Sequence, residues 1–293
     1  MCIRDSFDST QRLLVADRRW LYSGKDSIAA ELVTLLLQGP SSDIAPAVSS
    51  PIPKDATFLG LNDGVYEFGG MAGMSQEDRL KFAAQLVWTL NNAEAANSVR
   101  ATIDGSPLVD GMEEMTIDDF AEFNPEDSAQ AVSTLYAVND GSLLEVTSEG
   151  SAEVTGSAGQ IHDIQSADVS DEGVVAAVRK RSEEESQLAM GKLGQNLENS
   201  LKGKTLARPT FENGGQVAWT VIDGDRVVRV TRSPATGELS TSEVDMSELE
   251  GIEGEMSVIR LSATGARVAM IIDGSIYTGV VARATSGERR IVN

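Results

Sequence analysis

The sequence predicts a small α+β domain followed by an all-β region, an incomplete β-propeller. Patterns typical of helices alternate with patterns typical of strands along the first third of the chain, and short apolar strands separated by glycine turns repeat later on. An acidic stretch lies between these two regions. These changes divide the chain into residues 1–17, 18–110, 111–127 and 128–293.

Charge and residue counts exclude several classes of function. The chain has 293 residues and a formal net charge of −21, so a broad phosphate-binding surface for nucleic acid is not expected. One cysteine, Cys2, and one histidine, His162, cannot build a disulfide framework or a Cys/His zinc site within one chain. No apolar run is long enough to span a bilayer.

Two helices and three strands are expected in the first domain. The first helix starts at Ser27, a residue suited to an N-cap, and ends at a Gly-Pro pair. The second starts at Ser75, followed by an acidic first turn and an apolar face. A Pro- and Ser-rich connector follows the first helix at residues 41–53. Three strand-like runs, at residues 56–59, 64–68 and 98–103, are expected to form one sheet with the helices on one face.

Two segments are expected to lie outside the folded domains. Residues 1–17 contain neither a signal-like apolar run nor a continuing helical pattern, so we interpret them as non-native or disordered, with the native N-terminus missing. Residues 111–127 carry many carboxylates and no Lys or Arg, which is typical of a solvated acidic linker.

A repeated phrase indicates the propeller. When three related segments are aligned on Gly173, Gly215 and Gly265, the steps between them are 42 and 50 residues. Such a period, with a turn glycine between two short strands, is typical of four-stranded propeller blades. In the second and third repeats an Asp-Gly turn follows the apolar strand, at Asp223 and Asp273, again 50 residues apart. We expect about three to four blades in residues 128–293.

Five segments, residues 35–41, 82–90, 99–107, 259–269 and 276–281, resemble in order and spacing the actinobacterial LpqB lipoproteins, which join a GerMN domain to a C-terminal β-propeller. The resemblance implies a protein of the cell envelope, exported and lipid-anchored to the outer face of the cell membrane. It also implies an accessory role in signal transduction, towards the sensor kinase of a two-component system. The signal and the lipidated cysteine are not present, because no apolar run precedes Cys2. We expect a fragment truncated at both ends.

Few residues suggest chemistry. His162 and Asp163 are adjacent and would point to opposite faces of a strand, which suits a loop histidine better than a general base with its carboxylate. Residues 156–159 lack the full Gly-x-Ser-x-Gly pattern of a nucleophile elbow. The acidic runs at 110–127 and 238–255 do not follow a calcium-loop pattern, so a linker and a loop between blades are favoured.

The remaining candidates also favour structural roles. Residues 179–181 are all basic and precede three glutamates at 183–185, so mutual neutralisation is expected rather than phosphate binding. Trp88 and Trp219 are expected in cores rather than at binding hot spots. The role of Trp20, Tyr22 and the preceding pair of arginines stays open.

We therefore expect a non-enzymatic interaction protein, with no catalytic, cofactor-binding or metal-binding residues and no cofactor. The partner implied by the resemblance is the extracytoplasmic domain of a sensor histidine kinase, and cell-wall components come second. Nucleic acid is not expected, and membrane contact is expected only through a lipid anchor. Two alternatives stay open: the substrate-binding propeller of a cell-envelope hydrolase whose catalytic domain is missing, and a cell-wall glycan-binding module in residues 18–110.

Overall fold

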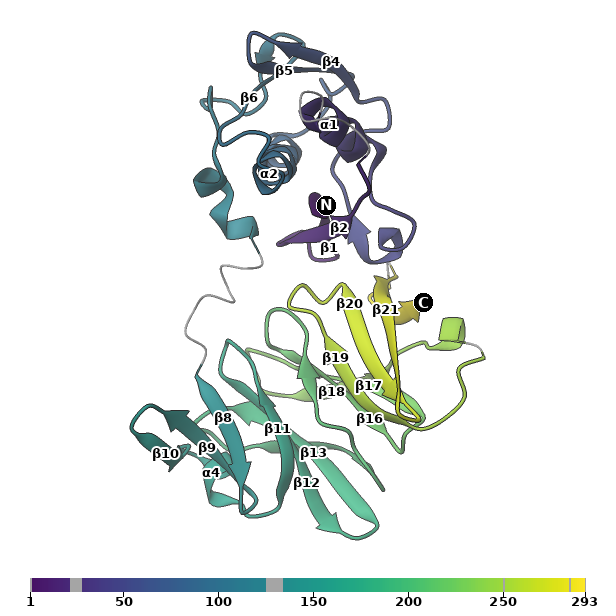
Figure 1. The fold of residues 1–293 in the computed structure, drawn as a ribbon. Coiled ribbons are helices and arrows are strands. Elements are labelled where there is room, and N and C mark those ends of the chain that lie inside the picture. Colours follow the sequence, from purple (N-terminus) through teal and green to yellow (C-terminus); the bar gives the residue numbers. More distant parts are fainter. Residues whose placement is uncertain (1, 22–27, 125–133, 250, 285, 293) are drawn as a thin grey trace. The chain divides into compact units, whose positions relative to one another are not determined.

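The computed structural model describes residues 2–21, 28–124, 134–249, 251–284 and 286–292 (Figure 1). The chain forms two compact units, Met1–Ser128 and Ala129–Asn293. Ser27 and Tyr22, which the sequence singled out, lie outside the described residues. No helix among the described residues is long and apolar enough to cross a membrane.

The first unit contains two sheets and two main helices. One sheet has the strand order β4-β5-β6-β7, in which β5 and β6 run parallel because α2 connects them, and the other has the order β2-β1-β3. The elements are β1 (Cys2–Asp8), β2 (Leu14–Arg18), α1 (Ile28–Gln38), η2 (Ala45–Ala47), β3 (Val48–Ser49), β4 (Thr57–Asn62), β5 (Val65–Gly69), α2 (Gln76–Asn92), β6 (Arg100–Ile103), β7 (Ser106–Pro107) and η3 (Ile117–Phe123).

Helix α2 is the centre of this unit. Its N-cap is Ser75, as predicted, and the Ser75 hydroxyl accepts a hydrogen bond from the backbone N–H of Asp78 at 3.1 Å. The sequence predicted one apolar face, but residues 81–90 are all buried. The reason is that α2 lies between the two sheets (Figure 1), with the Phe82 ring edge-on to Phe68 at 5.1 Å.

The expectation that residues 1–17 are disordered and lie outside the folded domain is wrong for the described residues, whereas no observation tests whether they are native. Residues 2–8 and 14–18 are paired antiparallel strands, and Phe7 and Leu14 are buried in the core of the first unit. The turn between the strands is stabilised by Asp8, whose carboxylate accepts hydrogen bonds from the backbone N–H groups of Arg12 and Leu13, both at 2.8 Å. The segment adds a second layer to the core, which a reading of its polar N-terminal residues did not suggest.

The acidic linker expected at residues 111–127 is also wrong for its described part. Phe120, in η3, is fully buried, and its carbonyl accepts a hydrogen bond from Nε1 of Trp88 at 3.0 Å. The start of η3 is closed by a capping box between Thr116 and Asp119. The carboxylates face outward while the apolar residues between them pack inward, so an acidic composition did not mean a solvated segment.

The second unit consists of four antiparallel sheets arranged one after another (Figure 1). The first has three strands, in the order β10-β9-β8, and the next three have four strands each in sequence order. The elements are β8 (Leu135–Asn139), β9 (Ser142–Thr147), β10 (Gly150–Glu153), α4 (Ser157–Gln160), β11 (Ile164–Val169), β12 (Val174–Ser182), β13 (Glu185–Lys192), β14 (Glu198–Gly203), β15 (Thr210–Phe211), β16 (Val217–Ile222), β17 (Arg226–Arg232), β18 (Leu239–Glu243), η4 (Ser247–Leu249), β19 (Met256–Leu261), β20 (Arg267–Ile272), β21 (Ser275–Arg283) and β22 (Arg289–Val292).

The predicted turns are where the repeat placed them. Gly173, Gly215 and Gly265 join the first and second strands of their sheets and have φ values of 71°, 64° and 69°. Asp223 and Asp273 also have positive φ, as residues that open tight hairpin turns do. The prediction of an α+β domain followed by propeller sheets is confirmed.

Each pair of neighbouring sheets shares its own apolar cluster. Leu143, in the first sheet, packs with Val175 and Ala177 of the second. The other face of β12 packs against the third sheet, and Trp219 of the third sheet lies in a cluster with Ile259 of the fourth. The alternation along the strands therefore buries both faces of an internal sheet.

Candidate interaction site

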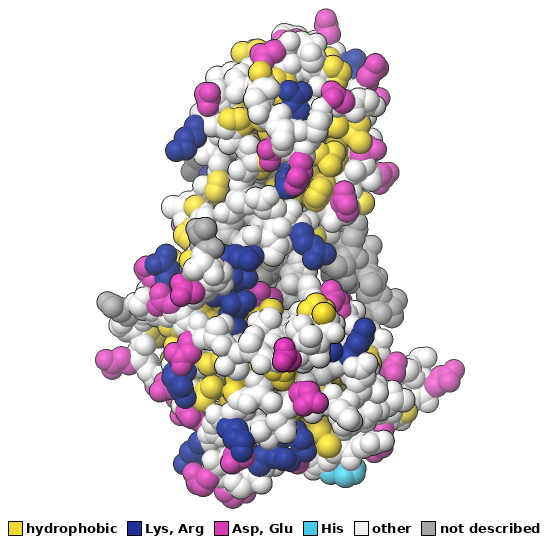
Figure 2. Space-filling view, turned by 180° about the vertical axis from the view of Figure 1, so that it is seen from behind, with side chains coloured by type: hydrophobic (Ala, Val, Ile, Leu, Met, Phe, Trp, Pro, Cys, Tyr) yellow, Lys and Arg dark blue, Asp and Glu magenta, His cyan; other side chains and the backbone are white. Residues whose placement is uncertain are grey.

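Two concave regions on the second unit are candidate surfaces for contact with a partner. One is a groove between the outer strands of the second and third sheets, and the other is a pocket between β8 and β11. Acidic and basic side chains mix on the visible face of the molecule (Figure 2), so local geometry matters more than overall charge.

The groove, named here the outer groove, consists of two adjoining cavities of about 500 and 460 Å³. Both are lined by Lys192, the last residue of β13, and Arg232, the last residue of β17. Amide side chains of Gln195 and Gln216 supply further donors and acceptors. The groove runs from the strand ends of one sheet to the loop at residues 233–238 of the next.

The two cations of the outer groove are available for a ligand. Lys192 is exposed, and neither it nor Arg232 makes an ion pair within the described part of the chain. The Arg232 guanidinium donates one long hydrogen bond, 3.4 Å, to Oε1 of Gln216, and Nε2 of Gln216 donates to the Glu172 carboxylate at 2.7 Å. Glu172, Glu198 and Glu238 also line the groove, so it has mixed charge, and a carboxylate from a partner would be favoured only beside the two cations.

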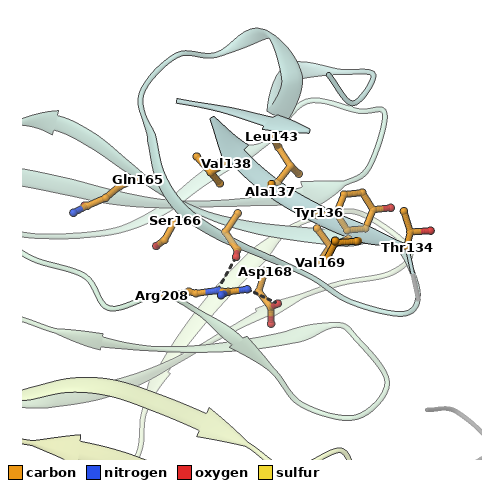
Figure 3. A pocket seen from close by; sticks show the side chains of 12 residues that line it. Thr134, Tyr136, Ala137, Val138, Leu143, Gln165, Ser166, Asp168, Val169 and Arg208 are labelled. Atoms are coloured by element: carbon orange, nitrogen blue, oxygen red, sulfur yellow. Dashed lines mark hydrogen bonds and ion pairs between the residues drawn. The ribbon is translucent and has the colours of Figure 1, made fainter. Parts of the chain in front are cut away.

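The pocket between β8 and β11, of about 400 Å³, is drawn in Figure 3. Arg208 lies at one side, where its Nε donates to the Ala167 carbonyl at 3.1 Å and a terminal nitrogen lies 3.8 Å from the Asp168 carboxylate (Figure 3). Burial raises the pKa of Asp168, while the nearby charges of Arg208 and Arg260 oppose the rise. Arg260 continues the contacts, donating to the Arg208 carbonyl at 2.9 Å.

These contacts connect one sheet to the next. Arg208 precedes the third sheet and reaches back to the second, and Arg260 lies in the fourth and reaches back to the third. Burial and the charge of Arg208 lower the pKa of Arg260, against the influence of Asp168. Arg208 and Arg260 therefore connect the first strands of successive sheets. Their side chains make more contacts within the fold than those of Lys192 and Arg232 in the outer groove.

His162 and Asp163 do not form a catalytic pair. The His162 ring, exposed at the surface (Figure 2), makes a 2.9 Å hydrogen bond through Nδ1 with the hydroxyl of Ser142, which also donates to the Ile161 carbonyl. The Asp163 carboxylate instead pairs with two arginines, at 2.7 Å each. Ser142 is 2% exposed, so its hydroxyl is closed to a substrate.

The other predicted candidates are structural as well. The Ser157 hydroxyl accepts a hydrogen bond from the Leu197 backbone N–H at 2.8 Å. Trp88 is 8% exposed and Trp219 is fully buried, which confirms that both are core residues. Trp20 is 85% exposed.

Two of the three basic residues at 179–181 are paired with a carboxylate, which is not one of the expected glutamates, and Lys180 donates to the backbone carbonyl of Glu183 at 3.1 Å. Asp163, which precedes β11, pairs with both Arg179 and Arg181. Glu184 pairs instead with Lys204, in the loop after β14, and Glu185 pairs with Lys202 of β14, the strand next to β13. Burial opposes ionisation of Asp163, but the two arginines outweigh it and hold its pKa below the ordinary value.

The acidic runs do not converge. Glu243 pairs with Arg226 and Glu248 with Arg290, at 3.4 and 3.2 Å. In the ranges that the structure describes, no group of three or more His, Cys, Asp or Glu side chains is placed to bind a metal ion.

Sequence reasoning missed the outer groove. Its signal was present, because Lys192 and Arg232 each end an apolar strand in neighbouring repeats. Alignment on the turn glycines alone did not compare the third strands, and so did not place the two cations side by side.

Comparisons with known proteins identify both units. Residues 141–293 match a family described as the lipoprotein LpqB β-propeller domain, and residues 4–109 match one described as sporulation and spore germination. Lipoprotein LpqB of Corynebacterium diphtheriae is 37% identical over 98% of this chain and 51% of its own length. Lipoprotein LpqB of Mycobacterium tuberculosis is 30% identical over 96% of this chain and 52% of its own.

A solved structure titled as a putative TolB from Agrobacterium tumefaciens covers 53% of this chain and 57% of its own, with a TM-score of 0.38 and 12% identity, too distant to inform function. The chain spans about half the length of the curated relatives it matches. The match to the LpqB propeller and the identity along almost the whole chain show that the chain belongs to the LpqB lipoprotein family.

Proposed function

We propose that the chain is part of an extracytoplasmic, lipid-anchored protein that works by binding a protein partner, without catalysis of its own. The relatives are named as lipoproteins, which supports an envelope location on the outer face of the cell membrane. The partner proposed is the extracytoplasmic domain of an envelope sensor histidine kinase.

The observation that carries the binding role is the outer groove. Lys192 and Arg232 make no ion pair with a described carboxylate, although Glu172, Glu198 and Glu238 line the same concave surface, in a chain whose net charge is −21. A partner that places acidic side chains in the groove would gain charge-assisted hydrogen bonds. The residues best suited to chemistry, Ser142, His162 and Asp163, are engaged in structural contacts, which favours binding over hydrolysis.

The test is binding of the purified chain to the extracytoplasmic domain of the sensor kinase, measured by biolayer interferometry. The double variant Lys192→Ala, Arg232→Ala should weaken binding by about tenfold or more, mostly through faster dissociation. A matched double variant, Lys202→Ala with Lys204→Ala, removes the same charge from side chains that pair with glutamates at the surface, and should change affinity much less.

The outcomes separate the claims. Absence of binding by the unaltered chain to any sensor domain of the same organism would refute the proposed partner. Binding that both double variants leave equally strong would place the interaction on another surface. Release of product from cell-wall substrates by the chain would refute the absence of catalysis.

A further inference from the structure

Two arginines lie opposite each other at one end of the fourth sheet. Arg283, the last residue of β21, is paired in register with Arg289, the first residue of β22. The next pair along the hairpin is hydrogen-bonded, because the Ala284 N–H donates to the Glu288 carbonyl at 3.0 Å. The Arg289 carbonyl accepts from the Asp245 N–H at 3.0 Å, on the side of β22 away from β21. The two arginines are therefore a non-hydrogen-bonded pair, in which the Cα atoms are about 4.5 Å apart and the side chains come closest.

Both arginine side chains point toward the third sheet. Residues two apart in a strand share a face of the sheet. Arg283 shares its face with Val281 in β21, and Arg289 shares its face with Ile291 in β22. Val281 and Ile291 belong to the apolar cluster that joins the third and fourth sheets. The pair therefore lies at the rim of the contact between these two sheets, where Arg283 is exposed and Arg289 is buried.

The third sheet adds one further cation and one carboxylate to this rim. Nε of Arg229 lies 2.8 Å from one oxygen of Glu212, and Nη2 of Arg289 lies 3.2 Å from the other. The first oxygen also accepts a hydrogen bond from Nε1 of Trp219. One carboxylate thus serves two arginines and a tryptophan. None of the N–H donors of Arg283 has an acceptor among the residues that the structure describes.

The charges of this cluster do not balance. Arg229, Arg283 and Arg289 supply three positive charges and Glu212 supplies one negative charge, so three minus one leaves an excess of +2. Burial lowers the pKa of Arg289, and the charges of Arg229 and Arg283 lower it further, against the influence of Glu212. Like charges directly opposite each other on neighbouring strands destabilise a sheet. A bound anion would relieve this repulsion.

Other described carboxylates around β22 have partners of their own. Asp245 accepts from the Ser247 N–H at 2.9 Å, Glu248 pairs with Arg290 at 3.2 Å, and Glu288 accepts from the Ser286 hydroxyl at 2.9 Å. On the third sheet, Ser242 is exposed and lies opposite Arg229, on the same face. Its hydroxyl is a further donor for an anion.

We propose that Arg283 and Arg289 bind the terminal phosphate of a phosphate monoester at the rim between the third and fourth sheets. Such a group carries about −1.5 to −2 charge at pH 7, which matches the excess positive charge of the cluster. A carboxylate or a phosphodiester carries a single negative charge and would leave part of the excess uncompensated. The planar fork of a guanidinium binds phosphate oxygens through paired N–H donors, so two adjacent arginines can hold one phosphate from two sides.

The test titrates methyl phosphate into the 293-residue chain at constant ionic strength and about pH 7.5, where this monoester is mostly a dianion. The arginine Nε–H signals, followed by NMR, should shift in a saturable manner for Arg283 and Arg289. Arg283→Ala should weaken binding at least about tenfold. Dimethyl phosphate and acetate, each with one charge, should also bind at least about tenfold more weakly.

The matched control is Arg290→Ala. It removes the same charge from the opposite face of β22, where Arg290 pairs with Glu248, and should change the affinity less than about twofold. A second readout is the melting temperature, which methyl phosphate should raise for the unaltered chain and not for Arg283→Ala. Without the ligand, Arg283→Ala should be at least as stable as the unaltered chain, because it removes the like charge opposite Arg289.

Three results would overturn the proposal. Absence of a saturable shift at the two arginines would mean that they hold no phosphate. Equal weakening by Arg283→Ala and Arg290→Ala would mean that the chain responds only to overall charge. Equal affinity for methyl phosphate and for dimethyl phosphate or acetate would mean that the cluster does not select a monoester.

Discussion

The two units bury their apolar residues in different ways. In the first, both sheets, both helices and η3 contribute to one cluster around α2. In the second, three smaller clusters each join two neighbouring sheets. A core substitution in the first unit should therefore destabilise the whole unit, whereas one in the second unit should destabilise mainly the two sheets whose shared cluster it disrupts. Four predictions test this contrast.

Phe68→Ala should have the largest effect. Phe68 is fully buried and contacts Phe82 at the centre of the single cluster, so its truncation should cost about 3–5 kcal/mol and unfold much of the first unit. Calorimetry should show loss or a large shift of one transition, with the other unchanged. Leu59→Ala, at a side chain 61% exposed, is the control and should change little. A shift of both transitions would mean that the units unfold together.

Glu212→Ala should destabilise the contact between the third and fourth sheets by about 3 kcal/mol. The Glu212 carboxylate accepts hydrogen bonds from Trp219 Nε1 and Arg229 Nε, both at 2.8 Å, and from Arg289 at 3.2 Å. Its removal leaves two arginines, 12% and 7% exposed, without an anion.

The measurement for Glu212→Ala is amide exchange across the second unit, with urea unfolding for the magnitude. Faster exchange should appear in the third and fourth sheets and not around β8. Glu248→Ala breaks a surface pair with Arg290 and should cost at most about 1 kcal/mol. Uniformly faster exchange in all four sheets would show that the second unit is as cooperative as the first.

Gly265→Ala should cost about 1–2 kcal/mol. The residue has φ of +69° but open space around the added Cβ, so the cost is conformational only. Gly70, in the first unit, has φ of +74° and lies so close to Asp55 that an added Cβ would fall 2.1 Å from a backbone oxygen, so Gly70→Ala should cost clearly more. Urea midpoints of the two variants decide the order; a larger loss at Gly265 would contradict it.

Asp163→Asn should have the smallest effect, and one that depends on pH. Burial opposes ionisation of Asp163, but hydrogen bonds and charges from Arg179 and Arg181 outweigh it and lower its pKa below 3.8. Its ionised form therefore contributes stability above pH 3.8, and this contribution is lost as the pH falls through the lowered pKa. Urea midpoints should differ most between unaltered chain and variant near neutral pH and converge in acid. A constant difference would rule out the ion pairs as its cause.

The sequence predicted the elements with local signals and missed those that depend on packing. Ser75 and the glycines of the repeat carry signals that act over a few residues, because caps and positive φ angles are local requirements. The burial of α2 on all sides could not be foreseen, since it depends on a sheet that residues 2–18 form only when packed. The acidic segment was misread for the same reason, because the burial of Phe120 depends on Trp88.

The candidate site could be predicted only in part. Assignment of the tryptophans to cores followed from apolar patterns, whereas the outer groove joins side chains that are 40 residues apart, by difference of their numbers, and no local pattern pairs Lys192 with Arg232. From the sequence, Asp163 was considered only together with its neighbour His162, whereas its ion-pair partners, Arg179 and Arg181, lie on the adjacent strand β12.

The unequal steps of the repeat show where this architecture accommodates extra length. The step of 50 residues includes η4 and the loop that leads into β19, while the step of 42 passes from β14 to β15 through a short connection. Leu249 of η4 is 8% exposed, so the longer connection packs against the sheet beside it. Both connections also bond to neighbouring strands, Asp245 to β22 and Leu206 to β16, so new surface can be added between blades only where these contacts are kept.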